Sequence, residues 1–439
     1  MSTNNTPAAG TAAWRVATLT ESAQRLAKSG NLVDAEKLFE QILEAAPYHI
    51  RSLNFLSTRA MERGDYSRAR ALLERALKAD ASRPIVYQNL GLVLKAENDV
   101  EGALRAFQAA TKQRDNFVYS WIYQGQIHKE AGRSSEAIQA YAHALTLLPS
   151  LEATLANPAI PEAKRTLIRD AVLSLNEMKY AFFLEALTDT IAEHGVTSLQ
   201  RILDSASIKA GLMAPVYQHA LQRPDWIYLP GIHPEPFFST DQFQWIPELE
   251  LHTTEIRDEL QSLLEESDVF EAYVNLDHED TRQWKTLNHS QDWSSFHLYR
   301  AGKSLVENCQ RCPVTADVLA RLPLVKIEGH APEAFFSILK PGTHIPPHHG
   351  LGNYKLAVHL PLIIPADCAI RAGHETRAWE EGKCLIFDDS FQHEAWNNSK
   401  QIRAVLIFEI WNPALTEAER RGMSALVVAT NTFHARYGV

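Results

Sequence analysis

The sequence predicts an α-helical repeat array followed by a β-rich domain of the sandwich or jelly-roll type, with helices flanking the strands. Two observations predict this division. Small and large apolar residues recur with a period of 34 up to about residue 149, and from about residue 334 short apolar segments alternate with turn residues. The length of 439 residues also favours two or three domains.

The composition excludes several classes of protein. A net charge of −10 argues against binding to nucleic acid, because such proteins normally carry a basic face. No apolar run approaches the roughly 18 residues of a membrane span, and four cysteines are too few for a disulfide scaffold. We therefore expect a cytoplasmic protein, with a disordered tail over residues 1–17.

Four columns of residues keep the 34-residue step through the first third of the chain. Small residues lie where two helices approach closely, large apolar residues fill the space beside them, and Gly or Asn ends the first helix of each pair. This pattern resembles the tetratricopeptide repeat and predicts four repeats over residues 18–149, whose groove either binds a peptide or protein partner or serves only as a scaffold. The columns are Gly30, Gly64, Asn98 and Gly132; Ala35, Ala69, Ala103 and Ala137; Phe39, Leu73, Phe107 and Tyr141; and Ala23, Ser57, Gly91 and Gly125.

A helical connector or cap is predicted over residues 150–212, and the domain boundary follows it. Pro161 suits the first turn of a helix, and the apolar spacing of residues 162–194 is helical up to Gly195. Residues 199–209 have the pattern of a further short helix. Turn residues and aromatics then become frequent, so we expect the second domain to span residues 213–439.

The second domain contains strand-like segments and one amphipathic helix. Residues 249–265 have helical apolar spacing. The strand-like segments are rich in β-branched residues and are bounded by turn residues, which predicts a β-sandwich or jelly-roll. These segments are AFFSILK, KLAVHLPLII, CAIRA, KCLIFDD and RAVLIFEIW.

Two of the 18 histidines stand out by their context. His348 follows a strand in THIPPHHGLGN, and His393 lies between two strands in FDDSFQHEAWNN. His344 and His348 have the i, i+4 spacing of a helical zinc pair, but the two prolines between them exclude that helix. We expect instead a loop that presents His348 at the mouth of a barrel. Arg403 follows His393 by ten residues on the next strand, a spacing typical of iron(II)/2-oxoglutarate oxygenases.

The segments around these residues resemble the catalytic domain of aspartyl/asparaginyl β-hydroxylases over roughly residues 215–415, and that family also carries N-terminal tetratricopeptide repeats. The resemblance implies a double-stranded β-helix (cupin-like) domain that uses Fe(II), 2-oxoglutarate and O2 to hydroxylate the β-carbon of Asp or Asn in a polypeptide, and that releases succinate and CO2. The segments are RPDWIYLPGI, LELHTTEIRDEL, DWSSFHLYRAG, SILKPGTHIPPHHGLGNYKLAVHLPLIIP, CAIRAGHETRAWEEGKCLIFDDSFQHEAWNNS and RAVLIFEIWNP.

The same resemblance implies roles for individual residues. Two match the iron ligands, two match groups that bind the distal carboxylate of 2-oxoglutarate, and two match other parts of the co-substrate pocket. They are, in that order, His348 and His393; Arg403 and Ser337; and His359, which contacts the co-substrate, with Trp293, an aromatic residue of the same pocket.

Two positions bear on the third metal ligand and on the substrate. Gly350 lies two residues after His348, where the wider oxygenase superfamily has an acid. The resembling family also lacks this acid, which implies water as the third ligand. That family usually has arginine two residues before the co-substrate histidine and often another two before that, whereas this sequence has Ala357 and Lys355. Lys355 is a substrate-side candidate, but an ammonium does not reproduce a bidentate guanidinium, which puts acidic substrates in doubt.

Several alternatives stay open. His349 is a weaker candidate ligand, because adjacent residues on an extended segment point apart. Asp388 and Asp389 are expected to shape a turn or to support a ligand from behind. Ala357 leaves open the hydroxylation of a non-peptide small molecule or a lipid acyl chain. A repeat-based adaptor with an inactive oxygenase domain is the remaining alternative, and the oligomeric state is open.

Overall fold

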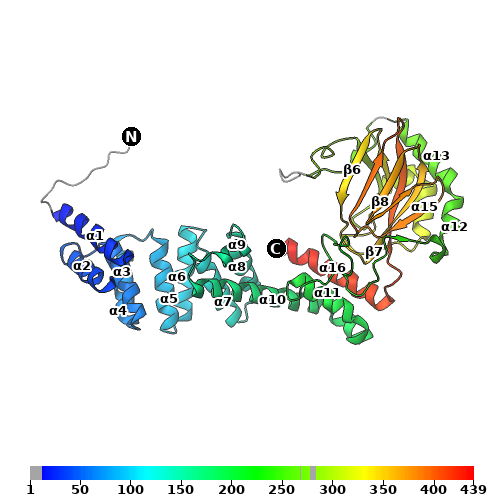
Figure 1. The fold of residues 1–439 in the computed structure, drawn as a ribbon. Helices are drawn as coiled ribbons and strands as arrows, with labels where there is room; N and C mark the ends of the chain where they lie inside the picture. The colour runs from blue at the N-terminus through cyan, green and yellow to red at the C-terminus, as the bar shows by residue number, and fades with distance from the viewer. Residues whose placement is uncertain (1–11, 267, 277–282) are drawn as a thin grey trace. The chain divides into compact units, whose positions relative to one another are not determined.

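The computed structural model describes residues 12–266, 268–276 and 283–439, and Figure 1 shows its helices and strands. The predicted repeat array is confirmed as successive helix pairs. The side chains of Asn31, Asp65 and Asp99 cap α2, α4 and α6 and keep the 34-residue step. The helices are α1 (Ala12–Lys28), α2 (Leu32–Ala45), α3 (Ile50–Glu62), α4 (Tyr66–Ala79), α5 (Pro84–Ala96), α6 (Val100–Gln113), α7 (Val118–Glu130) and α8 (Ser134–Thr146).

Close packing explains the glycine column of the repeats. A Cβ atom built on Gly91 would lie 2.6 Å from the Phe107 ring, and one on Gly125 would lie 2.6 Å from the Tyr141 ring. The helices of these pairs therefore approach each other over a residue without a side chain. The first helix begins at Ala12, so the predicted tail is wrong for residues 12–17, while residues 1–11 lie outside the described part of the chain.

The connector contains α9 (Leu151–Ala156), the continuous helix α10 (Glu162–His194) and α11 (Gln200–Ala210). The chain divides into two compact units, and the boundary lies within α10. The first unit ends at Met178 and also includes Tyr437–Val439, and the second is Lys179–Arg436. The boundary between the two units lies inside the predicted connector over residues 150–212, within the continuous helix α10. In the described residues, no helix is long and apolar enough to cross a membrane.

Two sheets form the centre of the second unit. The larger has the strand order β1-β10-β7-β12-β5-β3-β2, with β4 paired to β3, and the smaller has the order β6-β11-β8-β9. The strands are β1 (Phe237–Phe238), β2 (Glu271–Ala272), β3 (Trp293–Arg300), β4 (Lys303–Ser304), β5 (Ala334–Leu339), β6 (Thr343–His348), β7 (Lys355–Ile363), β8 (Cys368–Ala372), β9 (Glu375–Ala378), β10 (Leu385–Phe387), β11 (His393–Asn397) and β12 (Arg403–Trp411).

The alternation of side chains on β7 separates two layers of the core. Leu356, Val358 and Leu360 pack with helices on the outer face of the larger sheet (Figure 1). Ala357 packs with Ile345, Ile370 and other residues between the two sheets. Odd-numbered residues of β7 therefore face the space that contains the site. The helices of this unit outside the connector are α12 (Ile246–Leu251), α13 (Thr253–Leu264), α14 (Val306–Arg311), α15 (Pro313–Arg321) and α16 (Glu417–Tyr437).

Several predicted elements differ from the structure. His348 ends strand β6 rather than standing in a loop, and His393 begins β11. Strand β6 tolerates its two prolines because it is the edge strand of the smaller sheet and because both lie at a register shift opposite β11, where neither has a Cα partner. The helix predicted over residues 249–265 is instead two helices, α12 and α13, which are joined at His252.

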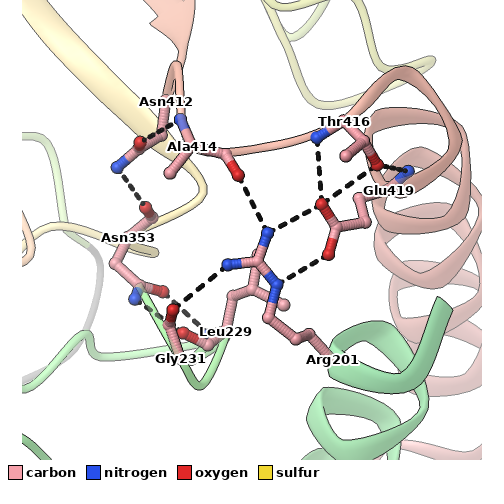
Figure 2. Close-up of polar contacts among 8 residues, drawn as sticks. All are labelled: Arg201, Leu229, Gly231, Asn353, Asn412, Ala414, Thr416 and Glu419. Atoms are coloured by element: carbon pink, nitrogen blue, oxygen red, sulfur yellow. Dashed lines mark hydrogen bonds and ion pairs between the residues drawn. The ribbon is translucent and has the colours of Figure 1, made fainter. Parts of the chain in front are cut away.

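The ion pair between Arg201 and Glu419 joins α11 to α16 within the second unit (Figure 2). Arg201 donates from Nε and Nη2 to the carboxylate of Glu419, at 2.6 and 2.7 Å. It also donates to the carbonyl oxygens of Gly231 and Ala414. Asn353 bonds both backbone groups of Leu229 at 2.8 Å, which fixes the neighbouring segment beside β7.

Candidate active site

A cavity of about 870 Å³ opens between the two sheets of the second unit. Its walls come from β3, β5, β7 and β12 of the larger sheet and from β6 and β11 of the smaller one. All the site residues predicted from the sequence line this cavity, although they are spread over more than a hundred positions of the chain. These residues are Trp293, Ser337, His348, Lys355, His359, His393 and Arg403.

His348 and His393 face each other across the paired strands β6 and β11. Their Cα atoms are direct partners in the register, and their ring centroids are 4.0 Å apart. Each ring bonds a backbone carbonyl through Nδ1, His348 to Pro346 at 2.8 Å and His393 to Phe391 at 2.9 Å. Because a carbonyl oxygen only accepts, Nδ1 carries the proton and Nε2 presents a lone pair.

Electrostatics keep both rings neutral. Burial lowers the pKa of His348 and of His393, and each pKa is lowered further by a neighbouring histidine. A metal ligand must be a neutral imidazole whose other nitrogen is oriented by a hydrogen bond, and both rings satisfy this condition. In the described residues, no group of three or more His, Cys, Asp or Glu side chains could bind a metal ion. Both histidines therefore direct a neutral, oriented Nε2 lone pair toward the cavity.

Arg403 places a guanidinium in the same cavity, and it has no acidic partner among the described residues. Its Nη1 donates to the carbonyl and hydroxyl oxygens of Ser337, both at 3.2 Å. Its Nε is buried without a hydrogen-bond partner among the described residues. Burial lowers the pKa of Arg403 to about 10, so the side chain remains charged at neutral pH. A buried guanidinium with a free donor fits a carboxylate ligand.

Two tryptophans orient the groups beside Arg403. Trp293 donates from Nε1 to the hydroxyl of Ser337 at 3.1 Å, and Trp379 donates from Nε1 to Nδ1 of His359 at 3.2 Å. Since Nδ1 of His359 accepts, its Nε2 carries the proton and can donate to a ligand. Burial lowers the pKa of His359 to about 3, which keeps it neutral. Trp379 was missed from the sequence, because a lone tryptophan in a turn-rich segment carries no signal of its partner.

Asp389 occupies the space beside Gly350. A Cβ atom on Gly350 would lie 2.2 Å from Oδ2 of Asp389, and the Gly350 N–H donates to the Asp389 carbonyl at 2.6 Å. Asp389 lines the cavity, and burial raises its pKa to about 7. Asp388 instead accepts from Gln222 and from the backbone N–H of Ser390, as expected of a turn residue.

The other singled-out residues lie in different places. His344 lies outside the cavity, where its Nε2 contacts Glu394 at 2.7 Å. It therefore does not face the same site as His348. His349 does line the cavity, next to His348. Lys355 is buried and forms an ion pair with Glu409 of β12. Glu409 was missed, although a single charge within the apolar run LIFEIW was a usable signal of a buried partner.

Comparison with known proteins identifies a family for each of the two predicted parts of the chain. Residues 250–413 match the family model of the aspartyl/asparaginyl beta-hydroxylase, and residues 26–91 and 60–121 match tetratricopeptide-repeat models. The human aspartyl/asparaginyl beta-hydroxylase is 40% identical over 144 residues, which are 32% of this chain and 19% of that protein.

Two further relatives match a longer stretch. The aspartate beta-hydroxylase domain-containing protein 2 of Xenopus tropicalis is 30% identical over 212 residues, covering 47% of this chain and 55% of the relative. The ornithine lipid ester-linked acyl 2-hydroxylase of Rhizobium tropici is 33% identical over 186 residues, covering 42% of this chain and 63% of the relative. The matches thus span from about a fifth to less than two thirds of these relatives. The chain carries a domain of the aspartyl/asparaginyl beta-hydroxylase family, which follows an array of tetratricopeptide repeats in the sequence.

Proposed function

We propose that the chain is an Fe(II)- and 2-oxoglutarate-dependent dioxygenase that hydroxylates an amino-acid side chain in a peptide or protein. The observation that carries this proposal is the presence, in one cavity, of two neutral, oriented histidines and a buried guanidinium that has no acidic partner among the described residues. When bound, iron(II) with 2-oxoglutarate and O2 would supply the oxidation that converts a substrate C–H into C–OH, with succinate and CO2 as co-products.

The residues of the chain divide the remaining work. His348 and His393 would hold the metal through Nε2 and leave its other positions open. Arg403 would bind the distal carboxylate of 2-oxoglutarate, with the hydroxyl of Ser337 beside it. His359 would donate from Nε2 to the co-substrate. Trp293 would close the pocket against water, because its ring packs on Tyr273 with centroids 4.1 Å apart.

Metal binding and co-substrate turnover test the proposal. Wild-type chain should bind one Mn(II) or Fe(II) per molecule and should form succinate from 2-oxoglutarate in the presence of Fe(II) and ascorbate. His393→Ala should lose both properties. His344→Ala is the matched control, because His344 lies on β6 but bonds Glu394 outside the cavity. Wild-type protein that binds no metal would overturn the proposal and favour a repeat-based adaptor with an inactive oxygenase domain.

We further propose that the repeats bind part of a polypeptide substrate, because such arrays present an extended concave surface. Hydrogen–deuterium exchange of the full chain, with and without the polypeptide found to be hydroxylated, would test this role. Protection within residues 12–146 is the expected result. Protection confined to residues 179–436 would contradict it.

The cysteines of the described chain are free thiols, which suits a reducing compartment such as the cytoplasm, where Fe(II) persists.

A second candidate function is the hydroxylation of a non-peptide substrate, such as a small molecule or a lipid acyl chain. The rim of the cavity favours such an apolar substrate, because the lining residues Leu276 and Leu351 are 43% and 45% exposed. The relative from Rhizobium tropici is named for acyl hydroxylation of a lipid. Mass spectrometry of peptide mixtures and of lipid extracts after turnover would distinguish the two by showing which class gains one oxygen atom.

A further inference from the structure

We infer that the substrate group entering this cavity carries a positive charge, as an ammonium or a guanidinium, and that Glu333 and Glu409 recognise it. The inference rests on the proposed function, because it takes the cavity to be catalytic. It concerns the end of the cavity formed by Glu333, Lys355, Asp389 and Glu409, which we call the acidic end.

The lysine at the acidic end is already neutralised. The side chain of Lys355 is 5% exposed and pairs with Glu409, whose side chain is 13% exposed. Ala357 lies directly opposite Glu409 in the register of β7 and β12 and offers no charge. Lys355 is therefore not free to bind an acidic substrate, since such binding would leave the buried Glu409 uncompensated.

Glu333 adds a second carboxylate beside this pair. It precedes β5, and its backbone N–H donates to Oε2 of Glu409 at 3.4 Å. Its own carboxylate accepts from the Ala301 N–H at 2.5 Å and lies 3.3 Å from Nδ1 of His297. Among the described residues, Glu333 pairs with no lysine or arginine. Glu409 thus has Lys355 as its partner, whereas Glu333 beside it faces only the imidazole of His297 among the described residues, and a second cation would complete the arrangement.

The remaining charges do not offset this excess. Asp389 lines the cavity, and its Oδ1 is buried without a hydrogen-bond partner among the described residues. At the rim, Glu271 and Arg300 form an exposed ion pair at 3.2 Å and cancel each other. Without Asp389, whose pKa is raised to about 7 by burial, the lining residues described here still contain three glutamates against Lys355 and Arg300, once Arg403 is assigned to the co-substrate.

Aromatic side chains beside the acidic end also suit a cation. Tyr273 lines the cavity and stacks on Phe335 with ring centroids 5.2 Å apart. Aromatic faces attract ammonium and guanidinium groups and pack against the methylene stems that carry them. An acidic side chain would meet the same aromatic faces and carboxylates, with no free cation for it among the described lining residues once Arg403 is assigned to the co-substrate.

Binding measurements on the full chain loaded with Mn(II) and 2-oxoglutarate test the inference. The probes are capped peptides, Gly-Gly-X-Gly-Gly, in which X is Lys, Arg, norleucine, Asn or Asp, together with butylamine and dodecylamine as non-peptide cations. Calorimetry should show the Lys or Arg peptide, or one of the amines, binding at least tenfold more tightly than the norleucine and Asp peptides. The peptide and amine arms distinguish a polypeptide source of the cation from a small-molecule or lipid source.

Variants assign the recognition to Glu333. Glu333→Gln should reduce the preference for the best cation over the norleucine peptide by roughly tenfold, as expected for a lost hydrogen bond between charged groups. Glu333→Asp should restore part of that preference, which a purely structural role would not predict. Glu271→Gln is the matched control at the exposed rim and should change the preference by less than about twofold.

The outcomes separate the two proposals. A chain that binds neither metal nor 2-oxoglutarate would overturn the proposed function itself. A chain that binds both, but prefers Asp or Asn peptides or binds no cationic probe, would overturn only the cationic substrate. An unchanged preference in Glu333→Gln would also overturn the assignment to Glu333.

Discussion

The carboxylate of Asp389 lies where a side chain at Gly350 would project, with Oδ2 2.2 Å from the position of a Cβ atom. Position 350, two residues after His348, therefore has no acid of its own. The carboxylate of Asp389, from another segment, occupies the space beside it. Glycine at position 350 is required by this contact and not by its backbone angles, because its φ is not in the left-handed region.

This contact predicts that Gly350→Ala destabilises the second unit by about 1–3 kcal/mol, the usual cost of inserting a methyl group into a packed site. The same substitution in an Asp389→Ala background should cost at least about 1 kcal/mol less, because the obstructing carboxylate is gone. Chemical denaturation of the four proteins measures this coupling. Additive effects would show that the two residues do not contact each other.

Arg403→Lys should raise the Kd for 2-oxoglutarate by roughly 10- to 100-fold, since one ammonium replaces a guanidinium that can donate two bonds to a carboxylate. Tryptophan fluorescence during titration with 2-oxoglutarate follows this change. Arg371→Lys is the control, because Arg371 pairs with Glu394 outside the cavity. Equal affinities for wild type and Arg403→Lys would remove Arg403 from the co-substrate site.

The depressed pKa of His359 predicts a loss of stability in mild acid. Burial, with Arg403 nearby, lowers this pKa from an ordinary value of 6.5 to about 3. The folded chain therefore binds fewer protons between these pH values, so stability is full above pH 6.5 and falls by about 1.4 kcal/mol per unit below it. His359→Asn keeps an acceptor for Trp379 but does not titrate. Its unfolding midpoint should fall less than that of wild type between pH 7.5 and 5, and parallel curves would contradict the prediction.

Gly91→Ala should destabilise the repeat array by about 1–3 kcal/mol, because the new methyl group would meet the Phe107 ring. Phe107→Leu removes the obstructing ring atoms and is expected to reduce the cost of the alanine when the two changes are combined. Circular dichroism during thermal unfolding measures all three variants. A stabilised Gly91→Ala protein would show that the helices can separate at no cost.

Glu419→Gln should destabilise the second unit by about 1–3 kcal/mol, since Arg201 would lose the charge of a buried acidic partner. Hydrogen bonds from Arg201 and Thr416 hold the pKa of Glu419 below its ordinary value despite burial, so this contribution is present at neutral pH and is lost in acid. Glu417→Gln is the control, because Glu417 is 73% exposed and its contact with Arg421 is long, at 3.8 Å. Thermal unfolding of both variants at pH 7 makes the comparison.

Periodic features of the sequence predict most of the helices. The 34-residue columns identify α1 to α8, and helical spacing up to Gly195 predicts α10, which ends at His194. Strand β6 could not be predicted, because Pro346 and Pro347 oppose a strand unless it lies at a sheet edge, and edge positions depend on the tertiary fold. The boundary within α10 left no signal, because no breaker residue marks it.

The site shows a similar limit. His348, His393 and Arg403 have recognisable neighbours in the sequence, and the structure places them in one cavity. Glu333 and Trp379 have no such context, because their importance arises from pairings between distant strands. The contact between Gly350 and Asp389 also depends on the pairing of two loops and cannot be read from either one alone.

The edge position of β6 has a consequence for association between chains. An exposed edge strand normally offers free N–H groups on which another strand can pair, and such edges promote aggregation. Pro346 and Pro347 have no N–H to offer, so the segment that ends at His348 is a poor template for another strand. His348, a candidate metal ligand, thus lies on an edge strand whose two prolines disfavour pairing with another chain.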